Sequence, residues 1–169
     1  DPNVAITAVT GTKHFTIPML VNKKPYNDRN VRMALKLAID REEIVDKIIR
    51  GYGVPGNDHP ITPAMQYYNK NLEQRTYDPD RARHYMKKAG MLEHTFKLHA
   101  ADAAFAGAID ASILYQEQAK KAGIKIKVVR EPDDGYWSNV WRVKKFSMCY
   151  WQGRPNADLI FSLAYRTGA

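Results

Sequence analysis

The chain has 169 residues, of which 44% are apolar, so it is long and apolar enough to form one domain with a core and is not expected to be disordered. Its formal net charge is +8, but the basic residues are spread along expected helix faces and strand edges. No recognised nucleic-acid-binding motif accompanies them. No run of about 18 apolar residues is present, so the sequence predicts no membrane-spanning helix.

Two strands are expected first, over residues 4–10 and 14–21; in the second, Phe15, Ile17, Met19 and Val21 alternate with Thr16 and Leu20. The expected turn between them is Gly11-Thr12. Pro18 has no backbone N–H, so it argues against a fully paired position in a central strand, or marks a bulge.

The segment 25–51 predicts two consecutive helices. In the first, Asn27 or Asp28 can accept the free N–H groups of the first turn. Its apolar stripe at helical spacing consists of Val31, Ala34, Leu35, Ala38 and Ile39. Asp40 and Glu43 form a capping-box pattern at the start of the second helix. The stripe expected to be buried on that helix consists of Ile44, Val45, Ile48 and Ile49.

A long loop is expected over residues 52–74, where glycine, proline and asparagine interrupt every periodic pattern. Such a long loop in a compact domain is usually functional or wraps the surface. Asp58 and His59 within it could suggest a metal site or a base. Turn chemistry is the favoured explanation, because Asn and Asp stabilise turns by local hydrogen bonds.

The next segment predicts a crossover unit. Asp78 caps a helix that has Pro79 at its first position and ends near Gly90. A strand is expected over 95–100, then a long helix over 105–122, then a strand over 124–128, as a crossover between parallel strands requires. The apolar residues of the long helix expected to face inward are Ile109, Ile113 and Leu114.

The last third predicts a turn at 132–135, with Asp134 as the cap of a short helix over 136–141. The segment 146–151 is apolar on both faces, so it is expected to lie centrally in the sheet, and a final helix is expected over 156–165. Together these elements predict an α/β (α+β) domain, with a mixed sheet flanked by helices and no domain linker.

No catalytic or metal-binding set is recognisable. The five histidines lack zinc-type spacing, and neither a phosphate-binding glycine loop nor a Gly-x-Ser-x-Gly elbow occurs. Enzyme function is therefore weakly supported, and no cofactor is expected. The single cysteine, Cys149, excludes an intrachain disulfide and is expected to be a small buried side chain.

The most informative cluster is aromatic and consists of Tyr136, Trp137, Trp141, Tyr150 and Trp151. Aromatic residues often belong to the core, which is the alternative explanation. Three tryptophans beside a Gly-Arg-Pro turn at a strand end fit a binding crevice better, because ligands of α/β sheets gather where strands end.

Four motifs, taken in order along the chain, resemble one large family. They are the run 25–51, Tyr77-Asp78-Pro79-Asp80-Arg81-Ala82 with Ala89-Gly90, the run Glu131-Pro132-Asp133-Asp134-Gly135-Tyr136-Trp137, and Tyr150-Trp151-Gln152-Gly153-Arg154-Pro155. They are similar to the dipeptide-, oligopeptide- and nickel-binding family of extracytoplasmic solute-binding proteins of ABC transporters, family 5. The last two resemble a peptide-receptor branch.

The resemblance implies that residues 1–169 form a single lobe, the second, of a larger two-lobed protein. It further implies that the intact protein binds a peptide-like solute between the lobes and delivers it to a membrane permease. The expected partners are the peptide ligand, the permease subunits and the first lobe of the same chain, with no nucleic acid. The expected location is periplasmic or extracytoplasmic, in association with the membrane through the transporter.

The ligand-binding residues expected from the aromatic cluster and the resemblance are Trp151, Gly153, Arg154, Asp158, Tyr136, Trp137 and Tyr150. In peptide receptors of the family, an aspartate that pairs with the peptide ammonium follows the corresponding tryptophan by three residues. Here Arg154 has that place, which favours an anionic ligand group or another register. Asp158 becomes the candidate partner for an amine, although a simple Arg154–Asp158 ion pair is also possible.

Two other functions are open on the sequence alone. A stand-alone basic domain could bind an acidic or nucleic-acid partner through its excess of lysine and arginine. A hydrolase on the same scaffold would turn over peptides.

Overall fold

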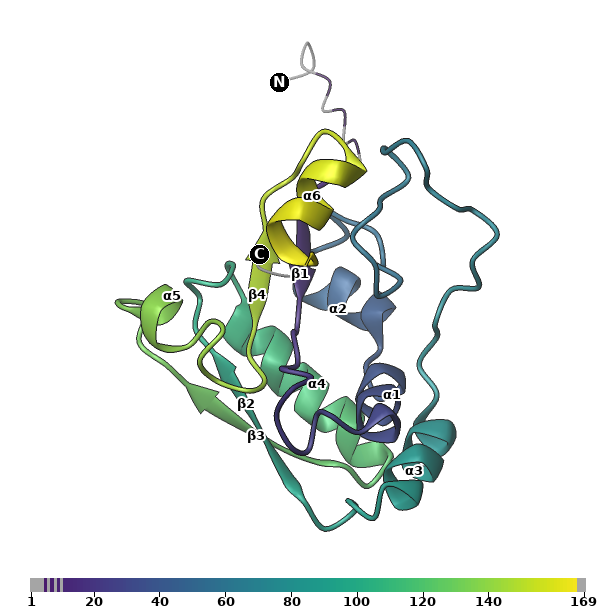
Figure 1. Cartoon of the computed structure of the whole chain (residues 1–169), viewed down its shortest axis with the longest axis vertical. Coiled ribbons are helices and arrows are strands. Elements are labelled where there is room, and N and C mark those ends of the chain that lie inside the picture. The colour runs from purple at the N-terminus through teal and green to yellow at the C-terminus, as the bar shows by residue number, and fades with distance from the viewer. Residues whose placement is uncertain (1–4, 6, 8, 10, 167–169) are drawn as a thin grey trace.

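The computed structural model describes residues 5, 7, 9 and 11–166. Helices and strands alternate along most of the chain, which confirms the predicted mixed α/β class (Figure 1). The elements are β1 (His14–Thr16), α1 (Arg29–Leu37), α2 (Arg41–Lys47), α3 (Pro79–Lys88), β2 (Thr95–Ala100), α4 (Ala108–Lys121), β3 (Lys125–Arg130), α5 (Tyr136–Asn139), β4 (Cys149–Trp151) and α6 (Ala157–Ala164).

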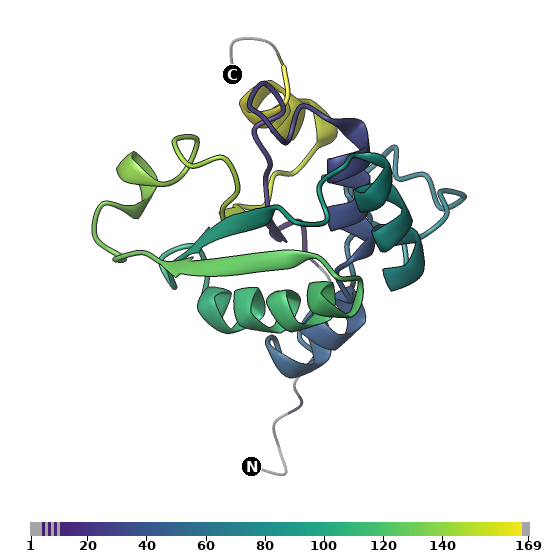
Figure 2. The same ribbon diagram turned by 90° about the horizontal axis from the view of Figure 1, so that it is seen from below.

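The crossover unit is present as predicted. β2 and β3 pair in parallel, with Thr95 opposite Lys125 and Ala100 opposite Arg130. α4 connects them and lies along one face of the pair (Figure 2). The buried side chains of this unit include Phe96, Leu98, Tyr115 and Ile124.

The segment 146–151 has the central position that its two apolar faces predict. The backbone N–H of His99 donates to the Phe146 carbonyl at 3.1 Å, and the N–H of Met148 donates to the His99 carbonyl at 2.9 Å, so residues 146–148 lie against β2. The segment then continues as β4, which pairs antiparallel with β1. It therefore connects two small two-stranded sheets, and regular strand structure is limited to its last three residues.

The N-terminal strands differ from expectation. The strand expected over 4–10 lies mostly outside the described residues, and Ala5, Thr7 and Val9 have no regular structure. The strand expected over 14–21 is only three residues long. Pro18 cannot donate to a ladder, and pairing resumes beyond it only at an isolated bridge between Met19 and Phe146.

Three predicted helix caps are confirmed. The side chain of Asp28 accepts from the Asn30 N–H, that of Asp40 from the Glu43 N–H, and that of Asp78 from the Arg81 N–H, at 2.7, 3.0 and 2.9 Å. Each cap satisfies a backbone donor that the first helical turn leaves free.

The capping box at Asp40 is not completed by Glu43. Instead, Gln118 of α4 accepts from the Asp40 N–H through Oε1 at 2.9 Å and donates through Nε2 to the Asp40 carbonyl at 3.2 Å. The same Nε2 donates to the Glu43 carboxylate at 2.8 Å. A buried amide from a distant helix thus does what the local box was expected to do, and it fixes α2 against α4.

Three side-chain predictions were wrong. Ile113 is 37% exposed, because the stripe of α4 that faces the sheet consists mainly of small residues, which let the helix approach closely. No residue of α2 is fully buried: Ile44 and Val45 are half-buried, as are Ile48 and Ile49, which follow the end of the helix. Asp134 caps nothing, since Gly135 is the N-cap of α5 with φ 72° and no side-chain hydrogen bond.

The predicted long loop is confirmed, since no helix or strand occurs between α2 and α3 in residues 52–74. Asp58 does more than local turn chemistry: it forms an ion pair with Arg41 at 2.8 Å and a second with Arg75. These contacts fasten the loop to the start of α2.

Candidate functional site

The predicted aromatic cluster is assembled in the structure. The Trp137 ring packs edge to face on Tyr150 and on Trp141, with centroids 5.4 and 6.1 Å apart. Trp141 packs in the same way on Trp151 at 6.0 Å. The cluster therefore joins α5 and the segment after it to β4, and Trp137 remains 39% exposed.

Tyr136 supports the cluster from the core. Its side chain is 1% exposed, and its hydroxyl donates to the Met148 carbonyl at 2.7 Å, with the His99 carbonyl 3.3 Å away. Burial raises the pKa of the Tyr136 phenol, which stays protonated as the hydrogen bond needs. Its contribution to any ligand site is to position Trp137, which it contacts with centroids 5.5 Å apart.

Alternation along the β1–β4 pair divides the cluster between two faces. Trp151 shares its face with Cys149. Cys149 is 1% exposed, and burial raises the pKa of its thiol to about 11, so it is a protonated core side chain and not a nucleophile.

The opposite face carries two residues that the sequence did not indicate. Phe15 stands opposite Tyr150 in the register and stacks on Phe105 at 4.0 Å. The Lys13 ammonium lies over both the Phe15 and Tyr150 rings, 5.5 and 5.1 Å from their centroids. The pairing of β1 with β4 spans most of the chain, so no local pattern could have placed Lys13 beside this cluster.

Gly153 and Arg154 lie where β4 ends, as predicted. A side chain at Gly153 would come within 2.4 Å of the Thr12 hydroxyl oxygen and 3.1 Å of the Lys13 backbone nitrogen, so close chain approach requires glycine here. Arg154 is half-buried and donates through Nη1 to the Gly153 carbonyl at 3.3 Å.

The possible ion pair between Arg154 and Asp158 is not formed in the described part of the chain, and Asp158 is exposed in the first turn of α6. The cationic groups of Lys13 and Arg154 thus lie on segments that meet at the end of the β1–β4 pair, and neither forms an ion pair with a described carboxylate.

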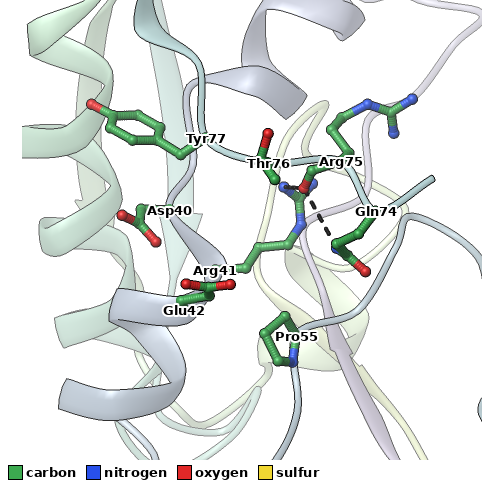
Figure 3. A pocket seen from close by; sticks show the side chains of 8 residues that line it. All are labelled: Asp40, Arg41, Glu42, Pro55, Gln74, Arg75, Thr76 and Tyr77. Carbon is green, nitrogen blue, oxygen red and sulfur yellow. Dashed lines mark hydrogen bonds between the residues drawn. The ribbon is translucent and has the colours of Figure 1, made fainter.

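A hollow of about 240 Å³ lies elsewhere, between the start of α2 and the long loop (Figure 3). Its lining residues are Asp40, Arg41, Glu42, Pro55, Gln74, Arg75, Thr76 and Tyr77. The Arg41 guanidinium donates to the Lys36 and Arg75 carbonyls as well as to Asp58, so it is fully engaged in holding the chain. Arg41, Arg75 and Asp40 of this hollow have structural partners, and none of the predicted site residues lines it.

Within the described residues, no group of three or more His, Cys, Asp or Glu side chains is placed to hold a metal ion. None of the helices there is long and apolar enough to cross a membrane.

Comparison with known proteins now gives the family. The model of bacterial extracellular solute-binding proteins, family 5 Middle, matches residues 1–166. The chain therefore belongs to the family 5 extracellular solute-binding proteins, as the sequence motifs predict.

Relatives and solved structures agree with this assignment. The chain is 33% identical over 96 residues to di/tripeptide-binding protein 1 of Pseudomonas aeruginosa (strain UCBPP-PA14). The aligned region covers 56% of this chain and 18% of that protein. HbpA2 from Haemophilus parasuis matches 90% of this chain and 31% of its own, with TM-score 0.80 and 21% identity. The match to DppA from Helicobacter pylori, solved in complex with the peptide STSA, covers 89% of this chain and 29% of the DppA chain, with TM-score 0.74 and 18% identity.

These two structures establish the shared fold. In every one of these comparisons the matched region spans less than a third of the other protein's length.

Proposed function

We propose that this chain is one lobe of an ABC-transporter receptor that binds a peptide-like solute in a cleft between two lobes. The receptor then delivers the solute to a membrane permease, outside the cytoplasm. The carrying observation is the family match over residues 1–166, together with a relative named as a di/tripeptide-binding protein. No covalent step is needed, because closure of one lobe on the other is the working motion.

The aromatic cluster at the end of β4 is the proposed contribution of this lobe to the cleft. Trp151, Trp137 and Tyr150 are all partly exposed, so they can still bury surface against a ligand. Aromatic side chains bury a large area and lose few rotamers on binding, which makes them suitable anchors. Gly153 lets the chain after β4 pass close to Thr12 and Lys13, just before β1, where a larger residue would not fit.

The charge at this place favours a ligand with an anionic group. Arg154 has a planar guanidinium that can hold a carboxylate or phosphate with two hydrogen bonds, and Lys13 adds a second positive charge nearby. A cation cannot anchor the ammonium group of a free-amine peptide. Asp158, exposed at the start of α6, is the proposed partner for an amine on the same ligand.

A thermal-shift screen of the full-length protein tests the proposal. The probes are di- to pentapeptides with free ends, the same peptides with an acetylated amine or an amidated carboxyl, and opines and sugars. Peptides with a free carboxylate should raise the melting temperature more than their amides. Retention on heparin that moderate salt abolishes, with no shift by any peptide, would instead favour a basic domain for acidic partners. Turnover of the peptides would favour a hydrolase.

A further inference from the structure

The C-terminal helix α6 (Ala157–Ala164) exposes most of its large apolar side chains. Leu159, Phe161 and Leu163 are 45, 43 and 46% exposed, and only Ile160 is buried. Asp158 is the single charged residue of the helix. A helix on the surface of a soluble domain normally turns one apolar stripe inward and a polar face outward, so this pattern marks an unfilled contact.

The exposed side chains form two ridges. Leu159 and Leu163 are one helical turn apart on one side. Phe161 and Tyr165 are one turn apart on the other, with their rings edge to face and centroids 6.0 Å apart. Tyr165 is 54% exposed, so both ridges present apolar surface to the outside.

Within the described chain, α6 is anchored by Ile160, which is 1% exposed and is the one buried residue of the helix. No other described helix or strand packs extensively against it. Its N-cap is local, since the Asn156 side chain accepts from the Leu159 N–H at 3.0 Å. A helix of eight residues is marginal by itself in water, so an amphipathic helix of this length normally depends on tertiary packing.

We infer that the two ridges of α6 dock against a part of the same polypeptide outside residues 1–169. The comparison with HbpA2 supports this occupant, because the match covers 90% of this chain but only 31% of the HbpA2 chain. Two-thirds of such a protein therefore remains to cover the ridges. An apolar face nearly without charge suits a permanent contact within one molecule better than a transient partner.

The inference rests on the two-lobed architecture of the proposed function, but its test needs no ligand, so the two can fail separately. Leu163→Cys and the control Lys120→Cys are made in the full-length protein and treated with N-ethylmaleimide. Lys120 lies in the last turn of α4 with its side chain 77% exposed. Cys149 gives a low background, because it is buried and its thiol pKa is raised to about 11.

We expect Leu163→Cys to react at least about tenfold more slowly than Lys120→Cys in the native monomer, and both to react alike in urea. Leu163→Asp should also lower the melting temperature clearly, whereas Lys120→Asp should change it little. Equal labelling rates in the native protein would overturn the inference. Protection that occurs only in a dimer and disappears on dilution would assign the ridges to a second copy and would overturn it as well.

Discussion

At the residue scale, the proposed ligand site depends on Trp151. Its indole packs on Trp141 yet is only half-buried, and it lies at the last position of β4. We predict that Trp151→Ala in the full-length protein weakens peptide binding by roughly tenfold or more, a loss of about 1.4 kcal/mol, with a smaller effect on thermal stability.

Calorimetry and thermal unfolding of the same variant separate binding from folding. Tyr115→Phe is a matched control, because it removes only the buried hydroxyl that donates to the Leu35 carbonyl at 2.7 Å. That control should cost stability, not affinity. If Trp151→Ala melts much earlier but binds equally well per folded molecule, Trp151 is a core residue.

Arg154 carries the prediction about ligand charge. Its guanidinium has no described carboxylate partner, so its charge is available to a ligand. Replacement by alanine should weaken binding of a free-acid peptide about tenfold and leave its amide unchanged, and Arg154→Asp should weaken the acid further by repulsion. Isothermal titration with the matched acid and amide measures this. If Arg154→Ala binds the free-acid peptide with unchanged affinity, Arg154 does not hold an anionic group of the ligand.

Some residue-scale features could be predicted and others could not. The cluster of Trp137, Tyr150 and Trp151 lies within a short span of sequence, so composition alone indicated it. Lys13 reaches the same place only through the pairing of β1 with β4, which a single sequence does not reveal. The contacts of the Lys13 ammonium with the Phe15 and Tyr150 rings depend on that long-range register.

At the element scale, caps and periodicity predicted most helices, while burial within them was less predictable. Asp28, Asp40 and Asp78 begin their helices as expected, because N-capping is a local interaction. α4 turns a stripe of mostly small residues inward and leaves Ile113 partly exposed. Small side chains let the helix pack close to the sheet, which Ile113 at that position would prevent. That choice depends on the partner surface and is absent from the local pattern.

The junction of α2 and α4 should depend on Gln118. Its amide is 1% exposed and binds both the N–H and the carbonyl of Asp40 as well as Glu43. Gln118→Leu should lower the free energy of unfolding by about 1–3 kcal/mol, because the Asp40 N–H loses its partner. Urea denaturation measures the loss.

The control for that experiment is Glu117→Ala on the same helix. Glu117 lies 56% exposed and pairs with Lys120 at 3.6 Å, an exposed ion pair that contributes little. Its replacement should change the free energy of unfolding by less than about 0.5 kcal/mol. Equal effects of the two substitutions would show that the Gln118 network does not stabilise the junction.

At the scale of the whole molecule, the described residues contain a buried core, whereas the site that we propose is one half of the proposed cleft. The core around Phe96, Leu98 and Tyr115 is buried within this chain, so residues 1–169 should fold by themselves. The aromatic end of β4 and the ridges of α6 remain uncovered. Ligand pockets normally bury most of the ligand surface, which one lobe does not provide.

The measurement that tests this account most directly is a calorimetric titration of one peptide into two proteins. The peptide is the one that stabilises the full-length receptor most in the screen, and the proteins are that receptor and residues 1–169. We predict that both are folded by circular dichroism and that residues 1–169 bind about tenfold more weakly or not at all, a loss of about 1.4 kcal/mol or more. Equal affinity of the two proteins for the peptide would contradict the two-lobed cleft.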